Sequence, residues 1–352
     1  MRVGLIASPF ISVPPVAYGG TELFIANLAE SLVQLGAEVV VYTNGESQVN
    51  APVRWLYPTH EWPLPNETAG ITKEIEHTAW AIGDAEKSCD IIHVSSALAV
   101  PFERFSMRPF VCTLHHPVSP SLTEIYRRYS RIAYVAISNH QALQHRDLGP
   151  TVIHHGLDMS QYRFRERKQP YAAFLGRICP IKGVHNAIAI AKQAGVPLKI
   201  AGEVQPVFHG YFEREIVPHL DGSMIEYVGE ADPALKNDLL CNASALLFPI
   251  EWEEPFGLVM IEAMACGTPV IAFPGGAVEE ILEDGITGRM CHSIPEAAEA
   301  LSCATFHPSA IRRRAEVRFS ADVMARQYLS LYKSLLNETT PPLELDAEET
   351  AA

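Results

Sequence analysis

The stretch that most constrains the fold is 248–276, which reads FPIEWEEPFGLVMIEAMACGTPVIAFPGG. Its first apolar residues predict a strand, and an acidic loop then leads to a predicted helix that begins at Pro255 or Phe256 and ends at Cys266. Gly267 follows, and proline near the start with glycine just past the end is the usual asymmetry of a helix. A second apolar run predicts another strand. This order predicts part of a doubly wound sheet, in which ligands bind at the carboxyl ends of the strands.

The same alternation of strand and helix recurs in both halves of the chain. Short, continuous runs rich in β-branched residues predict parallel strands that are buried on both faces. In the first half, a strand over 2–7, a Gly-Gly loop, a helix over 21–35 and a strand over 38–43 form one βαβ unit. A second series begins at Tyr171. The predicted fold class is α/β, with two Rossmann-like doubly wound domains that face a central cleft.

Domain boundaries follow from the change of pattern between the two series. A charged, non-periodic linker over 161–169 lies at the boundary between an N-terminal domain, 1–162, and a C-terminal domain, 163–320. A long amphipathic helix is predicted over about 309–336, and its last part, 321–336, lies beyond the second domain. The acidic, proline-containing tail 337–352 is expected to be disordered because it cannot bury enough apolar surface.

Charge and cysteine usage restrict the kinds of partner. The chain has 352 residues, with 27 Lys and Arg against 41 Asp and Glu, so its formal net charge is −14. Such a field repels nucleic acid and anionic membranes, and an anionic substrate therefore needs a local cluster of cations. No stretch reaches the ~20 apolar residues of a membrane span. The seven cysteines include no C-x-x-C pair, which favours reduced thiols and a cytoplasmic location.

Two cations follow the first predicted strand of the second half. Arg177 and Lys182 flank a turn that leads to Gly183 and a predicted helix. Arginine binds diphosphate oxygens through two parallel hydrogen bonds, and lysine binds them as a point charge. Ordinary exposed cations are the alternative. In a chain this acidic, we favour a diphosphate clamp.

Two carboxylates flank the start of the helix in the opening stretch. Glu254 precedes it and Glu262 lies within its first turns. An ionised carboxylate accepts hydrogen bonds from hydroxyls, which suits a sugar or a ribose. The amides of Phe256, Gly257 and Leu258 at the helix start suit a hydroxyl or phosphate oxygen. Taken alone, two glutamates in a charged loop are more often solvated surface.

Two smaller features belong to the first half. Gly19 and Gly20 precede the helix over 21–35, where free amides and the helix dipole attract anions. Taken alone, such a pair is commonly a tight turn. His115 and His116 follow the strand predicted over 110–114, and a lone histidine there is usually a core or surface residue.

Taken together, these residues resemble the motifs of retaining glycosyltransferases of family 4. Glu254 and Glu262 match the E-x7-E motif of that family, and Arg177 with Lys182 matches G-R-x4-K-G. The motifs span 18–288, and the N-terminal half is most similar to a subgroup that includes antibiotic sugar-transferring enzymes. Further matching segments are Tyr18-Gly19-Gly20-Thr21-Glu22, Gly267-Thr268-Pro269-Val270-Ile271, Gly275-Gly276 with Glu279, and Gly285 with Thr287-Gly288.

For the second domain, the resemblance implies a donor site in a GT-B fold. Arg177 and Lys182 would hold the donor diphosphate. Glu254 would bind the donor sugar with help from the amides of Phe256, Gly257 and Leu258, and Glu262 would bind the ribose. The helix over 321–336 would cross back onto the first domain.

For the first domain, the resemblance implies the opposing wall of the cleft. Gly19 or Gly20 would let the backbone approach the phosphate. His115 lies in Thr113-Leu114-His115 and matches the T-x-H site beside the anomeric carbon. His116 is the less favoured of the two histidines.

The implied activity moves a hexose from a nucleoside-diphosphate sugar to a hydroxyl of a small molecule, a glycan or a lipid. A UDP-sugar is favoured, with GDP-mannose next. The chain has no D-x-D motif, so Arg177 and Lys182 are expected to replace a metal, and no cofactor is expected. No carboxylate is placed as an obvious nucleophile, which favours same-face attack with the departing phosphate taking the acceptor proton. Acceptor choice is expected to rest on 9–22, 58–70 and the loop after His116.

Other functions stay open at this point. A sugar-nucleotide 2-epimerase on the same fold would convert the donor without an acceptor, and a third option is a non-catalytic nucleotide-sugar binding protein. A nicotinamide dehydrogenase is disfavoured, because neither half has G-x-G-x-x-G after a strand. Arg127, Arg128 and Arg131 form a small basic patch, for which an ordinary solvated helix face is favoured over a membrane surface.

Overall fold

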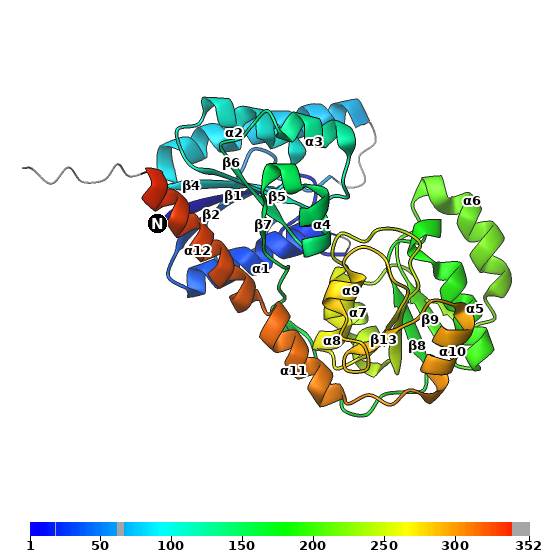
Figure 1. Ribbon diagram of the computed structural model, residues 1–352. Helices are drawn as coiled ribbons and strands as arrows, with labels where there is room; N and C mark the ends of the chain where they lie inside the picture. Colours follow the sequence, from blue (N-terminus) through cyan, green and yellow to red (C-terminus); the bar gives the residue numbers. More distant parts are fainter. Residues whose placement is uncertain (18, 62–66, 340–352) are drawn as a thin grey trace, which may run out of the picture.

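The computed structural model describes residues 1–17, 19–61 and 67–339, and it arranges their strands in two parallel sheets (Figure 1). Tyr18 of the first glycine motif lies outside the described residues. The same holds for 62–66 of the expected acceptor segment and for 340–352 of the expected disordered tail. The α/β fold class is confirmed, with one doubly wound sheet in each half of the chain.

Within the described ranges, the first sheet has seven strands in the order β3-β2-β1-β4-β5-β6-β7, and all neighbours are parallel. The strand order reverses between β1 and β4, which leaves a crevice at the carboxyl edge of the sheet. The strands are β1 (Arg2–Ile6), β2 (Glu38–Thr43), β3 (Val53–Trp55), β4 (Ile91–Val94), β5 (Phe110–Leu114), β6 (Ile132–Ala136) and β7 (Thr151–Val152).

The second sheet has six strands among the described residues, in the order β10-β9-β8-β11-β12-β13, again with parallel neighbours. Its order reverses between β8 and β11, so this sheet also has a crevice at its carboxyl edge. The strands are β8 (Ala172–Leu175), β9 (Leu198–Ala201), β10 (Ile225–Tyr227), β11 (Ala245–Phe248), β12 (Val270–Ala272) and β13 (Gly288–Met290).

Helices cover both faces of each sheet, which explains the nearly continuous apolar strands. Around the first sheet lie α1 (Gly20–Gln34), α2 (Glu67–Ser88), η1 (Ala97–Phe105), α3 (Pro120–Tyr126), α4 (Asn139–Gln144) and η2 (Arg146–Leu148). The second series comprises η3 (Met159–Gln161), η4 (Pro180–Lys182), α5 (Val184–Ala194), η5 (Pro206–Phe208), α6 (His209–Tyr211), η6 (Phe212–Ile216), η7 (Val217–His219), α7 (Pro233–Asn242), α8 (Leu258–Ala265), α9 (Val278–Ile281), α10 (Ile294–Cys303), α11 (Pro308–Phe319) and α12 (Ala321–Thr339).

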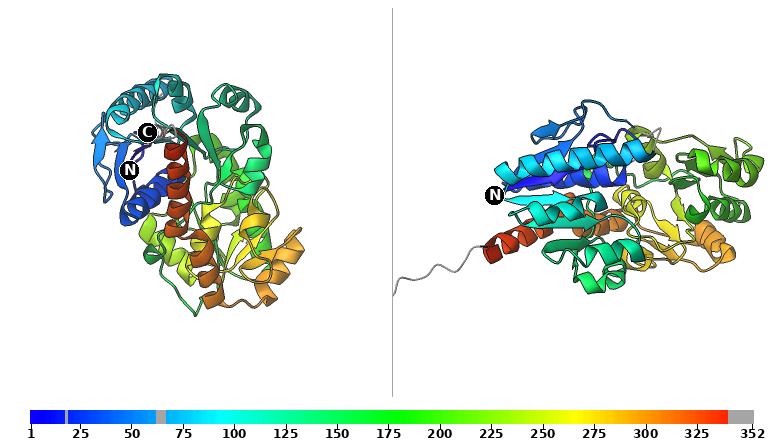
Figure 2. Two further views of the ribbon diagram at one scale, coloured as in Figure 1. Left: turned by 60° about the vertical axis from the view of Figure 1, so that its left-hand side comes forward. Right: turned by 90° about the horizontal axis from the view of Figure 1, so that it is seen from above.

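The prediction of a single long helix over about 309–336 is wrong. Ser320 has an extended conformation and separates α11 from α12. The cause is a contact with the segment that leaves the first sheet: the Leu157 amide donates to the Phe319 carbonyl, and the Ala321 amide donates to the Leu157 carbonyl, both at 2.8 Å. Beyond this break, α12 runs along the first domain (Figure 2).

The crossing of α12 onto the first domain is confirmed. Two of its tyrosines, Tyr328 and Tyr332, are fully buried in the same core as α1 and β1. The Tyr332 hydroxyl lies 2.7 Å from Nδ1 of His93, and the Tyr328 hydroxyl lies 2.8 Å from Oγ1 of Thr113. Since Thr113 is two residues before His115, α12 supports the wall of the cleft from behind.

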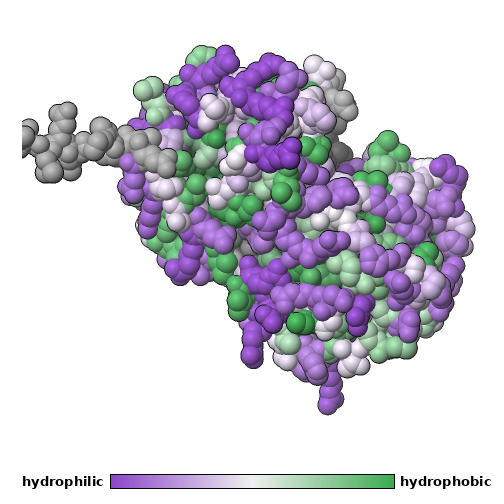
Figure 3. Space-filling model, in the orientation of Figure 1, coloured by the Kyte–Doolittle hydropathy of each residue, from purple (hydrophilic) through white to green (hydrophobic). Residues whose placement is uncertain are grey.

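The outer surface is mixed. Figure 3 shows polar side chains interspersed with small apolar areas over both lobes, as expected for a chain with a net charge of −14. Within residues 1–17, 19–61 and 67–339, no helix is long and apolar enough to cross a membrane.

Candidate active site

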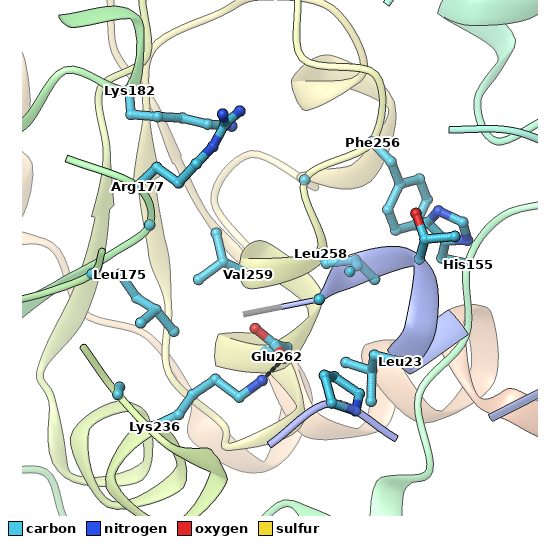
Figure 4. A pocket seen from close by; sticks show the side chains of 18 of the residues that line it. Leu23, His155, Leu175, Arg177, Lys182, Lys236, Phe256, Leu258, Val259 and Glu262 are labelled. Carbon is cyan, nitrogen blue, oxygen red and sulfur yellow. Dashed lines mark hydrogen bonds and ion pairs between the residues drawn. The ribbon is translucent and has the colours of Figure 1, made fainter. Parts of the chain in front are cut away.

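The crevices of the two sheets open onto one cavity of about 660 Å³ (Figure 4). Segments that follow β1 and β5 line it from the first domain, and segments that follow β8 and β11 line it from the second. Parallel strands bring their carboxyl ends to one edge of each sheet, so these loops converge although they are distant in sequence.

All the site residues predicted from the sequence line this one cavity. The fold therefore brings together both cations, both glutamates, the histidine and the two glycine-containing turns. These residues are Gly19, Gly20, His115, Arg177, Lys182, Glu254, Phe256, Gly257, Leu258 and Glu262.

The cationic wall starts at the end of β8. Arg177 and Lys182 extend in the same direction from this wall in Figure 4. The turn after them is tight: Gly183 has φ +73°, and a Cβ there would lie 1.8 Å from the carbonyl oxygen of Pro249. Only glycine fits such a close approach of two backbones. This packing fixes Lys182 beside the loop that carries Glu254.

Glu254 is held through one of its two oxygens. Lys182 Nζ donates to Oε2 at 2.6 Å, and the Trp252 indole N–H donates to the same oxygen at 3.1 Å. The Lys182 ammonium also lies 4.3 Å from the centre of the Trp252 ring. The carboxylate is only 7% exposed, and no described residue forms a hydrogen bond with Oε1. Oε1 is therefore the oxygen left for a ligand.

Glu262 repeats this arrangement. Its Oε1 accepts hydrogen bonds from the Tyr162 hydroxyl at 2.9 Å and from Lys236 Nζ, which Figure 4 shows as a dashed line. Burial and the adjacent Glu262 carboxylate raise the pKa of Tyr162 well above its ordinary value, so its hydroxyl stays a donor. Within the described residues, Oε2 of Glu262 has no hydrogen-bond partner and is the oxygen left for a ligand.

The first turn of α8 lies between these two glutamates. The helix begins at Leu258, two or three residues later than predicted, because Gly257 has φ +87° and cannot belong to it. The first amides of a helix have no intrahelical partner, and the dipole makes this end positive. Phe256, which precedes the turn, is 2% exposed and packs its ring against His155 and Phe319.

The first-domain wall consists of glycines and histidines. A Cβ on Gly20 would lie 3.2 Å from Cδ1 of Leu258, so the start of α1 approaches the start of α8 across the cavity. His116 uses both ring nitrogens internally, at 2.8 Å from the Pro117 carbonyl and 2.6 Å from the Tyr126 hydroxyl. His115 forms no such bonds with the described residues; its Nε2 is buried without a partner among them, and burial lowers its pKa to about 3.

Comparison with known proteins assigns both halves of the chain. A family model described as Glycosyltransferase Family 4 matches residues 18–161, and one described as Glycosyl transferases group 1 matches residues 159–303. The chain belongs to glycosyltransferase family 4. The two matches divide near residue 160, close to where the first sheet gives way to the second.

This glycosyltransferase resembles others over nearly its whole length. It is 24% identical over 370 residues to a phosphatidyl-myo-inositol mannosyltransferase of Mycobacterium leprae (strain TN), with 95% of this chain and 97% of the relative covered. The solved structure of AviGT4, a glycosyltransferase involved in avilamycin A biosynthesis, is 24% identical, with 96% and 98% covered and a TM-score of 0.71. HepE of Anabaena, solved with UDP and glucose, is 19% identical, with 95% and 100% covered and a TM-score of 0.74. The structural likeness confirms the GT-B fold.

Several residues of the cavity wall of this glycosyltransferase were not predicted, among them Trp252, Lys236, Tyr162 and His155. Trp252 had a visible signal, since it is a single aromatic residue within an acidic loop. Lys236 and Tyr162 had none: Lys236 lies on α7, and Tyr162 lies in the segment interpreted as a linker. His155 follows β7 and also lines the cavity. Their roles depend on contacts across long sequence distances, which no local pattern shows.

One carboxylate of the second domain also binds the first domain beside the cleft. Glu280 accepts hydrogen bonds from the Asn139 amide, at 2.9 Å and 2.8 Å to its two oxygens, and from the Asn139 side chain at 2.7 Å. His154 pairs with the same carboxylate. Burial raises the pKa of Glu280, but these hydrogen bonds outweigh burial and hold it below 4.5. Glu280 thus caps α4 of the opposite domain.

Two further points concern possible metal ligands and the basic patch noted in the sequence. Within the part of the chain that the structure describes, no group of three or more His, Cys, Asp or Glu side chains is arranged to hold a metal ion. The basic patch is partly neutralised, as a solvated helix face would be. Its arginines, Arg127, Arg128 and Arg131, pair with Asp147, Glu124 and Glu103, respectively.

Proposed function

We propose that this glycosyltransferase moves a hexose from a UDP-sugar to an acceptor hydroxyl and retains the anomeric configuration. The observation that carries the proposal is the matched arrangement of Glu254 and Glu262. Each has one oxygen fixed by a lysine and an aromatic donor, and each has its other oxygen left for a ligand. Ionised oxygens held in this way accept hydrogen bonds from neutral hydroxyls. The α8 amides between them suit the diphosphate or sugar oxygens.

The cationic wall matches the charge that develops in the reaction. The leaving group is a nucleoside diphosphate, so negative charge grows on its β-phosphate oxygen in the transition state. Preorganised cations and helix amides stabilise such charge. Lys182 and Arg177 supply the cations, and the start of α8 supplies the amides. In this proposal neither a metal nor a cofactor is required, because the side chains provide the positive charge.

The roles assigned to the two glutamates favour a same-face mechanism over a covalent glycosyl–enzyme intermediate. Glu254 lies in an ion pair with Lys182, and Glu262 lies in one with Lys236. Because each carboxylate is paired with a lysine, neither is a free nucleophile. Both glutamates are therefore assigned as acceptors of hydrogen bonds from hydroxyls. We therefore favour same-face attack, in which the acceptor oxygen bonds to the anomeric carbon as the C–O bond to the diphosphate breaks. The departing phosphate takes the acceptor proton.

The donor assignment has support from one structural neighbour. HepE was solved with UDP and glucose, and it shares the fold over nearly the whole chain. GDP-mannose is the second candidate donor, favoured by the likeness to a mannosyltransferase of Mycobacterium leprae. The acceptor is proposed to be a hydroxyl of a small molecule, a glycan or a lipid. It would reach the cavity past the first-domain side, which is lined by Pro14, Pro15, Ala17, Gly19, Gly20 and 115–117.

The test of this function uses nucleotide sugars with and without acceptors. The protein is incubated with UDP-hexoses and GDP-mannose, an acceptor panel and a metal chelator, and proton NMR follows the anomeric protons. We expect UDP release and a glycoside with the donor's anomeric configuration in the presence of the chelator. An inverted product, or activity that the chelator abolishes, would contradict the mechanism. An epimerised donor formed without any acceptor would indicate the 2-epimerase instead.

A further inference from the structure

His155 lines the cavity and has no role in the site described so far. It follows β7 in the segment that leaves the first sheet, and its side chain is almost completely buried, with 4% of the residue exposed. Figure 4 shows it beside Phe256, two residues before the start of α8. Its neighbour His154 pairs with Glu280, which joins this segment to the second domain.

Three aromatic rings lock the His155 imidazole in one orientation. It stacks on His115 with the ring centres 5.3 Å apart and the planes within 9° of parallel. Its other ring contacts are with Phe256, at 4.9 Å and nearly perpendicular, and with Phe24, at 5.0 Å. Burial lowers the pKa of His155 well below 6.5, so the ring is neutral at neutral pH. A neutral imidazole has one N–H donor and one acceptor nitrogen.

The two ring nitrogens have different surroundings. Nδ1 is buried without a hydrogen-bond partner. Nε2 is not buried in this way and forms no hydrogen bond with any described residue, so it is the nitrogen open to the cavity. A polar atom held rigidly at a cavity wall without a protein partner is ready for a ligand hydroxyl, because an unmatched polar group is costly once the cavity closes around a substrate.

We propose that Nε2 of His155 forms a hydrogen bond with a hydroxyl of the transferred hexose, which makes His155 a residue that determines donor-sugar specificity. The placement favours the donor sugar. His155 lies between His115, assigned beside the anomeric carbon, and Phe256, whose amide is the first of those assigned to the sugar. This inference rests on the proposed function.

The test compares two variants, each of which keeps a different part of the histidine side chain. His155→Phe keeps a ring for the stack on His115 but removes both nitrogens. His155→Gln removes the ring but places an amide nitrogen near the position of Nε2. Both are assayed with UDP-hexose and with donors that lack one sugar hydroxyl at a time. UDP without a sugar, measured by thermal shift, reports whether the nucleotide site is intact.

For the wild-type protein, removal of the contacted hydroxyl is expected to lower kcat/KM about tenfold, as for one lost neutral hydrogen bond. His155→Phe is expected to show about the same loss with the full donor and no further loss with that one deoxy donor. His155→Gln is expected to recover part of the activity, and UDP is expected to bind both variants as it binds the wild-type protein.

Three results would overturn the inference. The first is equal sensitivity of wild type and His155→Phe to every deoxy donor. The second is coupling to an acceptor hydroxyl in place of a donor hydroxyl, measured in the same assay with acceptors that lack one hydroxyl at a time. The third is loss of UDP binding in both variants, which would make the residue structural. If the wild-type protein itself turns over no nucleotide sugar, the proposed function fails first, and that result is distinct from these three.

Discussion

At the scale of single residues, the clearest feature is that each glutamate of the site keeps one oxygen for a ligand. Glu262 has Oε1 bound by Tyr162 and Lys236, so Oε2 faces the position assigned to the ribose. Its carboxylate is 4% exposed. A hydrogen bond to an ionised oxygen in such a place contributes about 1.5–3 kcal/mol.

Glu262→Gln should therefore weaken UDP binding by roughly tenfold to hundredfold. The substitution removes the charge that Lys236 neutralises and weakens the acceptor for the ribose hydroxyl. Isothermal titration calorimetry with UDP measures the effect. Glu226→Gln is the matched control, since Glu226 forms an exposed pair with Lys199 in the same domain. Equal UDP affinity in wild type and Glu262→Gln would remove this residue from the nucleotide site.

Glu22, in the first turn of α1, gives a pH-dependent prediction. It is 6% exposed, and burial is the main cause that raises its pKa from 4.5 to about 7. Between these two pH values the folded protein binds more protons at this site than the unfolded chain. The stabilisation by Glu22 is therefore complete below pH 4.5 and is lost as the pH rises through 7. The difference corresponds to roughly 3 kcal/mol.

Glu22→Gln should remove this pH dependence. Relative to the variant, the wild-type free energy of unfolding should fall by roughly 3 kcal/mol between pH 4.5 and pH 8. Urea titrations of both proteins across this range provide the measurement. The comparison cancels the buried histidines, whose pKa values lie below 6.5 and act in the opposite direction in both proteins. If the free energies of unfolding of the two proteins change with pH in parallel, Glu22 is not a buried, protonated carboxyl group.

At the scale of elements, the break between α11 and α12 decides where the last helix goes. Gly156 lies under this break: a Cβ there would be 2.4 Å from the Ser320 carbonyl oxygen. The Gly156 carbonyl accepts a hydrogen bond from the Asn27 side chain of α1 at 3.1 Å. The contact thus joins α1, the segment after β7 and the start of α12.

Gly156→Ala should lower the free energy of unfolding by roughly 2 kcal/mol or more, because the added methyl group has no space. Gly83→Ala is the matched control. Gly83 lies inside α2 with no atom within 4 Å of an added Cβ, so alanine there should stabilise by about 0.5–1 kcal/mol. Chemical denaturation of the two variants gives both values. If Gly156→Ala leaves the free energy of unfolding unchanged, the crossing tolerates a displaced Ser320.

Element boundaries also show what the sequence could predict. The strands and the helices at glycine-containing turns were predictable, because each is a short apolar run with clear ends, as for β5 and α1. The break at Ser320 was not, since the pattern over 309–336 stays amphipathic and the Leu157 backbone imposes the break. Lys236 and Tyr162 escaped prediction for the same reason: what places them is a contact with Glu262, which is distant along the chain.

At the scale of the whole molecule, a small set of polar contacts joins the two domains beside the cleft. Glu280 binds the start of α4 and pairs with His154, and Glu253 lies 3.3 Å from the His140 ring. These contacts hold the wall that carries His155 against the wall that carries α8. The motifs predicted the two domains, but they gave no information on this link, because its members have no common pattern.

Glu280→Ala should loosen the two domains and raise the KM for the donor. Loss of the carboxylate that caps α4 should also lower the free energy of unfolding by about 1 kcal/mol. Small-angle X-ray scattering is expected to show a larger radius of gyration. Glu299→Ala, an exposed position on α10, serves as the control and should be within about 0.5 kcal/mol of wild type. An unchanged radius of gyration together with an unchanged KM would show that Glu280 does not set the cleft width.

The central claim is that the cleft binds a nucleoside diphosphate through the cationic wall at the end of β8. The most direct measurement is the thermal shift of wild type and Arg177→Ala with UDP, GDP and ADP, since a ligand that binds the folded state raises its apparent stability. We predict that UDP raises the melting temperature of the wild-type protein most, and that Arg177→Ala loses most of this shift. No shift with any of the three nucleotides, or an equal UDP shift in both proteins, would contradict the account.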